Sequence, residues 1–120
     1  MSEVVHIKWY ATVLRSDLFA DAVAEMAPIT LRYGATRYAV HRSEDDRYNI
    51  LLIVWFDHHG DWYRFWESPE LVEFRARYSG KYQVPIVYVW HDEIAAGSLD
   101  AGIETRESVD QPTTTQASTS

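Results

Sequence analysis

The stretch that decides the fold runs from Tyr48 to Phe74 and reads YNILLIVWFDHHGDWYRFWESPELVEF. Its first part, Tyr48 to Phe56, is an almost unbroken apolar run rich in branched and aromatic residues. Such a run predicts a strand that is covered on both faces. Alternate side chains point to opposite faces of a strand. The expected faces are Leu51, Ile53 and Trp55 on one side, and Ile50, Leu52, Val54 and Phe56 on the other.

A helical segment is predicted directly after this strand. Trp62, Phe65 and Trp66 recur at a spacing that places them on one face of a helix. Asp57 is the expected N-cap of that helix. Ser68-Pro69 then predicts a restart, with the serine as N-cap and the proline in the first turn, where its missing N–H costs nothing.

The rest of the chain supplies three more strands and one more helix. Alternation predicts a first strand over 3–12 and a second over 36–42, followed by a charged hairpin turn over 43–47. Ser16 is the expected cap of the first helix, which Pro28 kinks or stops, with Gly34 as its final stop signal. The fourth strand is expected over 82–91, at a sheet edge or with a bulge, because proline at 85 cannot donate to a ladder.

The order β-α-β-β-α-β predicts an α+β, ferredoxin-like fold with a four-stranded antiparallel sheet and helices on one face. The other face of this sheet would then expose apolar side chains of the 48–56 strand. An exposed apolar face of that size indicates a partner surface. The simplest partner is a second copy, which would close the two sheets into a dimeric barrel around a cavity.

Composition excludes several classes of function. The net charge of −7 argues against nucleic acid and against anionic membrane surfaces. The chain has no cysteine, so disulfides and thiolate metal sites are excluded. No apolar run approaches the ~20 residues that span a bilayer, and the N-terminus shows no signal pattern. We therefore expect a cytoplasmic protein.

The composition changes near residue 96. Residues 1–96 are predicted to form the single domain, and 97–120 a disordered acidic tail rich in Ser and Thr.

Candidate chemistry lies on one face of the first strand. His6, Lys8 and Tyr10 share that face, and His41 and Asn49 flank the predicted hairpin. The row is either a solvated sheet face or the polar wall of a cavity. A histidine near pH 7 can take or give a proton, so His41 or His6 is the candidate base, with Tyr10 and Asn49 beside it.

Aromatic residues indicate a planar ligand, although core packing is the alternative. The candidate pocket residues are Lys8, Trp55, His59, Trp66 and Trp90. His58 and His59 are adjacent and diverge in direction, so no metal site is predicted there.

The pattern from Trp55-x-Asp57 through Trp62-x-x-Phe65-Trp66 to Ser68-Pro69-x-Leu71-x-x-Phe74 resembles the dimeric α+β barrel superfamily, nearest its antibiotic-biosynthesis-monooxygenase-like group. The resemblance implies a homodimer and a small cofactor-independent oxygenase that acts on an aromatic or polyketide-like molecule. Cyclases, isomerases and non-catalytic binding or accessory proteins share the scaffold and remain alternatives. Haem-degrading members carry an asparagine where Lys8 stands and a histidine near Phe74, so this chain departs from that pattern.

Overall fold

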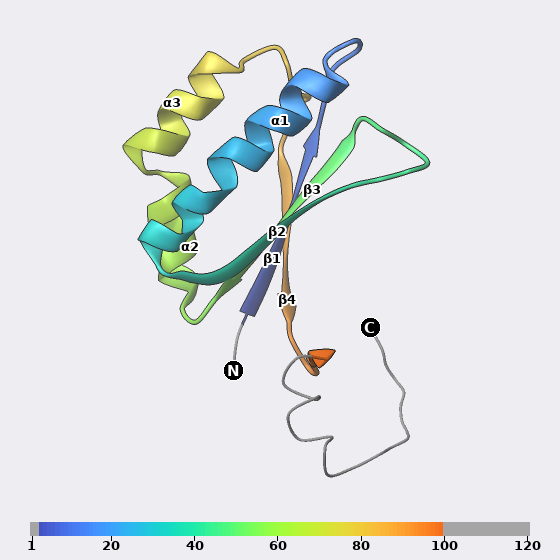
Figure 1. The fold of residues 1–120 in the computed structure, drawn as a ribbon. Helices are drawn as coiled ribbons and strands as arrows, with labels where there is room; N and C mark the ends of the chain where they lie inside the picture. The colour runs from blue at the N-terminus through green and yellow to red at the C-terminus, as the bar shows by residue number, and fades with distance from the viewer. Residues whose placement is uncertain (1–2, 100–120) are drawn as a thin grey trace.

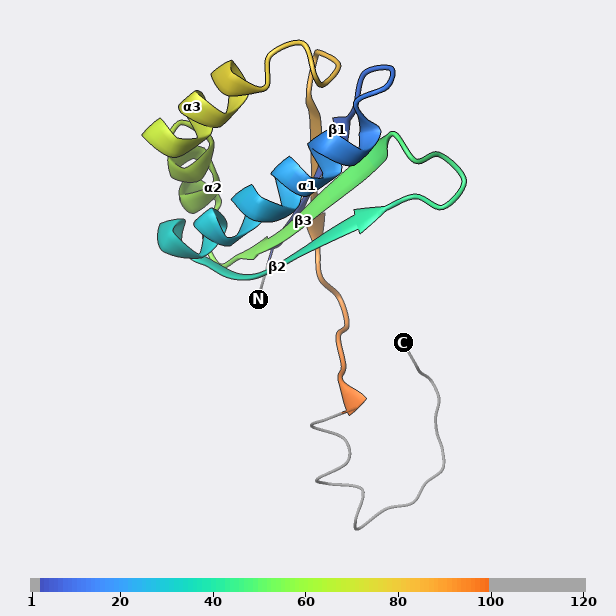
Figure 2. The ribbon, with the colours of Figure 1, turned by 45° about the horizontal axis from the view of Figure 1, so that its top comes forward.

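The computed structural model describes residues 3–99. The elements in chain order are β1 (Glu3–Tyr10), α1 (Ser16–Met26), the 3-10 helix η1 (Ala27–Tyr33), β2 (Ala35–Arg42), β3 (Asn49–Phe56), α2 (His59–Trp66), α3 (Pro69–Arg77) and β4 (Val87–Asp92). The four strands form one antiparallel sheet in the order β2-β3-β1-β4. The helices all lie on one side of this sheet, and no helix or strand of residues 3–99 covers its other side (Figures 1 and 2). The predicted α+β, ferredoxin-like fold is therefore confirmed. Residues 100–120, most of the predicted tail, lie outside the described part of the chain.

Helix boundaries follow the sequence signals in two places. Ser68 is the N-cap of α3, where its hydroxyl accepts a hydrogen bond from the backbone N–H of Leu71, and Pro69 is the first helical residue. The chain also turns into η1 around Pro28 and leaves it at Gly34, whose φ of 102° favours glycine. A Cβ at Gly34 would stand 2.4 Å from the Asp61 carboxylate, so α2 packs against the backbone at this turn.

Three predicted boundaries are wrong. Asp57 does not cap α2, because His58 occupies the N-cap position. Ser16 lies inside α1, and its hydroxyl donates to the carbonyl of Arg47 instead of capping the helix. The last strand begins at Val87, after Pro85, while residue 82 makes only an isolated bridge to the end of β1. This strand does lie at the sheet edge, as the proline predicted.

The core lies between the sheet and the helices. Trp9 of β1 is fully buried at its centre, and its ring centroid lies 5.7 Å from that of Phe19, 5.6 Å from Trp66 and 5.5 Å from Phe74. These three partners come from α1, α2 and α3, so one side chain touches every α-helix. Aromatic pairs at such distances contribute about 0.5–1.5 kcal/mol beyond the burial of their area. The space between helices and sheet is thus occupied by the protein's own rings.

Candidate functional site

The bare side of the sheet, called the open face below, is built by strand register. Residues opposite each other in an antiparallel pair point to the same side. His6 lies opposite Ile53 and Val89, and Lys8 lies opposite Leu51 and Val87. The open-face positions of the four strands are Val4, His6, Lys8, Tyr10, Arg37, Ala39, His41, Asn49, Leu51, Ile53, Trp55, Val87, Val89 and His91. The face therefore combines apolar side chains with basic and hydrogen-bonding groups.

His6 is the most enclosed titratable group of this face. Its ring centroid lies 4.2 Å from that of His91 on the neighbouring strand. Burial, then the charges of His91 and His41, lower the pKa of His6 below its usual 6.5. The imidazole is consequently neutral at pH 7 and can accept a proton.

His41 shares the open face but not the enclosure of His6. It lies on β2 opposite Leu51, one strand beyond β3 from His6, and it is exposed. The two histidines interact through their charges, which places them in one electrostatic neighbourhood.

Tyr10 and Asn49 lie directly opposite each other at one end of the face. The hydroxyl of Tyr10 donates to the carboxylate of Asp46, and this bond, with partial burial and the negative charge, raises the pKa of Tyr10. The phenol thus remains protonated at neutral pH. Tyr10 lies four residue steps of about 3.3 Å each along the strand from His6, so these two do not converge on one small group.

Lys8 stands between these two ends. With Tyr10, Gln83, Val84, Pro85 and Val87, it lines a depression of about 310 Å³ at the β1–β4 edge of the open face. That volume is at the lower limit of ordinary small-molecule sites, which begin near 300 Å³. Within residues 3–99, the Lys8 ammonium makes no hydrogen bond or ion pair.

Trp55 marks the opposite end of the face. The Arg37 guanidinium lies over its ring, 4.2 Å from the centroid, in cation–π geometry. The indole N–H of Trp55 donates to the carboxylate of Glu93. The ring is thereby fixed in place while remaining partly exposed.

The remaining candidates lie on the helix side, away from the histidine pair. Trp66 stacks on Trp62 with ring centroids 5.1 Å apart, and Trp90 packs edge-on against Trp62 at 6.4 Å. His59 contacts the Trp90 ring at 4.0 Å and forms an ion pair with Glu3 if protonated. The structure therefore divides the candidate set between the two sides of the sheet.

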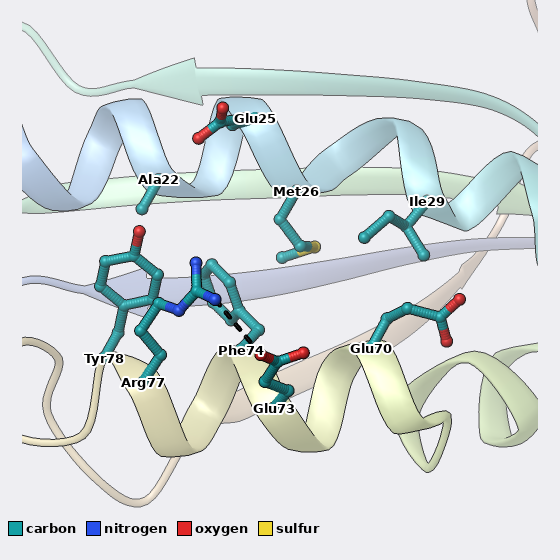
Figure 3. Close-up of a pocket in the computed structure, with 9 residues that line it drawn as sticks. All are labelled: Ala22, Glu25, Met26, Ile29, Glu70, Glu73, Phe74, Arg77 and Tyr78. Carbon is teal, nitrogen blue, oxygen red and sulfur yellow. Dashed lines mark hydrogen bonds and ion pairs between the residues drawn. The ribbon is translucent and has the colours of Figure 1, made fainter.

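A second depression lies between α1 and α3. Figure 3 shows Met26 and Ile29 facing Phe74 across it, with carboxylates along its rim. Arg77 pairs with Glu73 at 3.2 Å, so the one cation drawn there is already neutralised. The groove measures about 220 Å³, below the usual range for ligand pockets, and contains no histidine. It is a weaker candidate than the open face.

Two open-face residues, His91 and Arg37, were not among the candidates predicted from the sequence. His91 of β4 is exposed, and its ring contacts that of His6. Arg37 was not singled out at all. The signal for both was strand pairing, since each occupies an outward position beside a candidate residue. In residues 3–99, no three His, Asp or Glu side chains are grouped so that they could hold a metal ion. No helix in that part of the chain has the length and apolar character needed to cross a membrane.

Comparison with solved structures identifies the fold. A proposed antibiotic biosynthesis monooxygenase from Nitrosomonas europaea matches with a TM-score of 0.69 and 16% identity, covering 78% of this chain and 90% of its own. A similarly named protein from Bordetella bronchiseptica matches with a TM-score of 0.67 and 19% identity, covering 79% and 100%. A variant of SnoaB, a cofactor-independent oxygenase from Streptomyces nogalater, matches with a TM-score of 0.64 and 12% identity, covering 79% and 95%.

No family model and no curated protein sequence matches the chain. The resemblance to the antibiotic-biosynthesis-monooxygenase-like group, seen in the sequence motif, is confirmed at the level of the fold.

Proposed function

We propose that this chain forms a homodimer through its open face. In the space that the two faces enclose, the protein oxidises a small aromatic molecule with dioxygen and without a cofactor. The proposal rests mainly on the position of His6. Its imidazole is half-buried and neutral at pH 7, and it lies among apolar side chains on a sheet face that the helices leave uncovered. The likeness in fold to an oxygenase that uses no cofactor supports the reaction class.

The dimer follows from the composition of the open face. Val87 and Val89 of β4 are about half exposed, and Leu51 of β3 is partly exposed on the other side of His6 and Lys8. Exposed apolar side chains gathered on one face of a soluble domain mark an interaction surface. A domain of this size also buries only a modest share of its surface alone, so pairing stabilises it.

The chemistry needs one base and an electron-rich substrate. His6 takes a proton from an activated CH₂ or phenolic O–H group, and the resulting anion passes electrons to dioxygen. For an anthrone-type substrate the balance is CH₂ + O₂ → C=O + H₂O. One oxygen atom enters the product, the other leaves as water, and the substrate supplies all four electrons. The proton held by His6 leaves with that water.

His6 is preferred to His41 as the base because of its enclosure. His41 is exposed on β2, where solvent would screen it, while His6 lies on a central strand. In the proposed dimer His41 contributes to the same chamber and assists in proton transfer.

A non-catalytic binding or accessory dimer is the second candidate, since it would bind a ligand on the same open face without turnover. The space between helices and sheet is filled by aromatic side chains around Trp9 and Trp62, which leaves the open face as the place for a ligand. A cyclase or isomerase would use the same base and would consume no oxygen.

Oxygen uptake with anthrone and with 1,4-naphthohydroquinone tests the proposal. The wild-type chain should accelerate uptake above the uncatalysed background, and His6→Ala should lower kcat by about 10²-fold or more, the usual contribution of a general base. His41→Ala should have a smaller effect. His58→Ala, at an exposed histidine outside the open face, is the matched control. Uptake unchanged by His6→Ala would remove His6 as the base, and binding of these compounds without any uptake would favour the accessory protein.

A further inference from the structure

We propose that the occupant of the open face is an aromatic anion and that the Lys8 ammonium selects it. This inference rests on the proposed dimer and its chamber, and it specifies the substrate class. It starts from the distribution of charge between the open face and the rest of the chain.

The open face carries no acidic side chain at any of its strand positions, although the chain as a whole has a net charge of −7. Its permanent cations are Lys8 and Arg37. Among residues 3–99, carboxylates reach the face at its two ends, where Asp46 accepts from Tyr10 and Glu93 accepts from Trp55. A basic, apolar face on an acidic protein favours a ligand that is both negative and apolar.

Lys8 is placed to bind such a ligand. Its ammonium has no carboxylate partner within residues 3–99, while Arg32, Arg42, Arg64 and Arg77 each have one. The depression that it lines is bordered by the side chains of Pro85 and Val87, which offer contact to a ring rather than to a hydrated ion. An ammonium beside apolar carbon matches a carboxylate or phenolate attached to an aromatic ring.

Closure by a second copy favours binding of an anion. Two open faces brought together would enclose two copies of Lys8, neither with a carboxylate partner within residues 3–99, with the histidines beside them. Removing like charges from water without counter-charges is strongly unfavourable. An anion bound between the copies offsets this cost, so ligand binding and dimer formation are thermodynamically linked.

The same charge assists the proposed reaction. Lys8 and His41 lie in one row across the sheet, on either side of Leu51, and His6 is two residues along the strand from Lys8. A fixed positive charge at this distance stabilises the anion that forms when the base removes a proton. Lys8 therefore acts as a specificity-determining and positioning residue.

The test compares two probes of equal shape, 2-naphthoate and neutral 2-naphthamide, by isothermal titration calorimetry on the full chain. We expect 2-naphthoate to bind the wild type at least about tenfold more tightly and to raise the dimer fraction in sedimentation velocity. Lys8→Gln should remove this preference. Lys81→Gln makes the same change at a lysine that is not at an open-face position of the sheet, and it should retain the preference.

Two results would overturn the inference: equal affinity for the two probes, or a preference that survives Lys8→Gln. If either occurs while the protein is dimeric and oxidises neutral anthrone, the proposed function stands and only the charge selection fails. A monomer that binds neither probe and consumes no oxygen would reject the proposed function, and the inference with it.

Discussion

The two sides of the sheet are made by the same strands and carry different kinds of side chain. On the helix side, β1 contributes Val5, Ile7 and Trp9, all with no exposed surface. On the open side, the alternate residues of the same strand include His6, Lys8 and Tyr10, all of them at least partly exposed. Because side chains alternate along a strand, β1 packs one face against the helices and presents a mixed polar and apolar face on the other side. The helix side stabilises the domain, and the open side is available for a partner and a ligand.

The largest expected effect contrasts one tryptophan from each side. Trp62→Ala should lower the free energy of unfolding by about 3–5 kcal/mol, the range for a fully buried large aromatic side chain. Trp55→Ala, the same substitution at a partly exposed ring on the open face, should cost clearly less. Urea denaturation of the two variants measures the difference. Equal losses would show that the open face is as much a part of the monomer's core as the helix side.

A charge added to either side of the molecule should affect assembly only on the open side. Val89 on β4 and Val72 on α3 are 48% and 50% exposed, so they form a matched pair. Val89→Lys adds a further cation to a basic face and should shift the protein to monomer by at least tenfold in dimer dissociation constant, since like charges across an interface cost several kcal/mol. Val72→Lys should leave assembly unchanged, as judged by sedimentation velocity.

The acidic counterpart sharpens this comparison. Val89→Glu places a carboxylate opposite His6 and on the face that holds Lys8, so it should weaken the dimer less than Val89→Lys does. Equal disruption by both charges would indicate that apolar contact alone holds the copies together. Persistence of the wild-type dimer in all three variants would mean that the copies meet elsewhere.

The fold could be predicted from the sequence because its signals are local. The apolar run ending at Phe56, the Ser68-Pro69 restart and the stop at Gly34 each report the conformation of their own neighbourhood. The two N-caps were misplaced because a local pattern does not report contacts with distant parts of the chain. Ser16 and Asp57 are residue types that favour an N-cap, but the hydroxyl of Ser16 is used by Arg47, which lies on a distant turn. Such a competition is invisible in a local pattern.

The site was only half predictable because it depends on pairing between strands. The alternation of side chains along a strand placed His6, Lys8 and Tyr10 on one face, and the structure confirms this. His91 came into contact with His6 only through the β1–β4 register, which no local pattern fixes. Alternation alone also could not tell that Trp90 points to the helices while its neighbour His91 points away from them.

The smallest expected effect is a dependence of folding stability on pH that arises from a residue of the open face. The groups that face His6 are His91 on β4, His41 on β2 and Lys8 on its own strand, all of them basic. Burial and these neighbours lower the pKa of His6 in the folded chain below the unfolded value of 6.5. Between those two values the unfolded chain binds more protons, so stability falls as the pH drops through this window and rises as the pH increases. Above 6.5 the imidazole is neutral in both states and contributes no slope.

His6→Gln should therefore flatten part of the stability profile between pH 7 and pH 5, measured by urea denaturation, and His58→Gln should follow the wild type. Carboxylates also titrate toward the acidic end, so the informative quantity is the difference between the two variants rather than either profile alone. An unchanged slope in His6→Gln would show that His6 is no more enclosed than a surface histidine. The open face would then be a solvated surface, and the contrast between the two sides of the sheet would be one of packing alone.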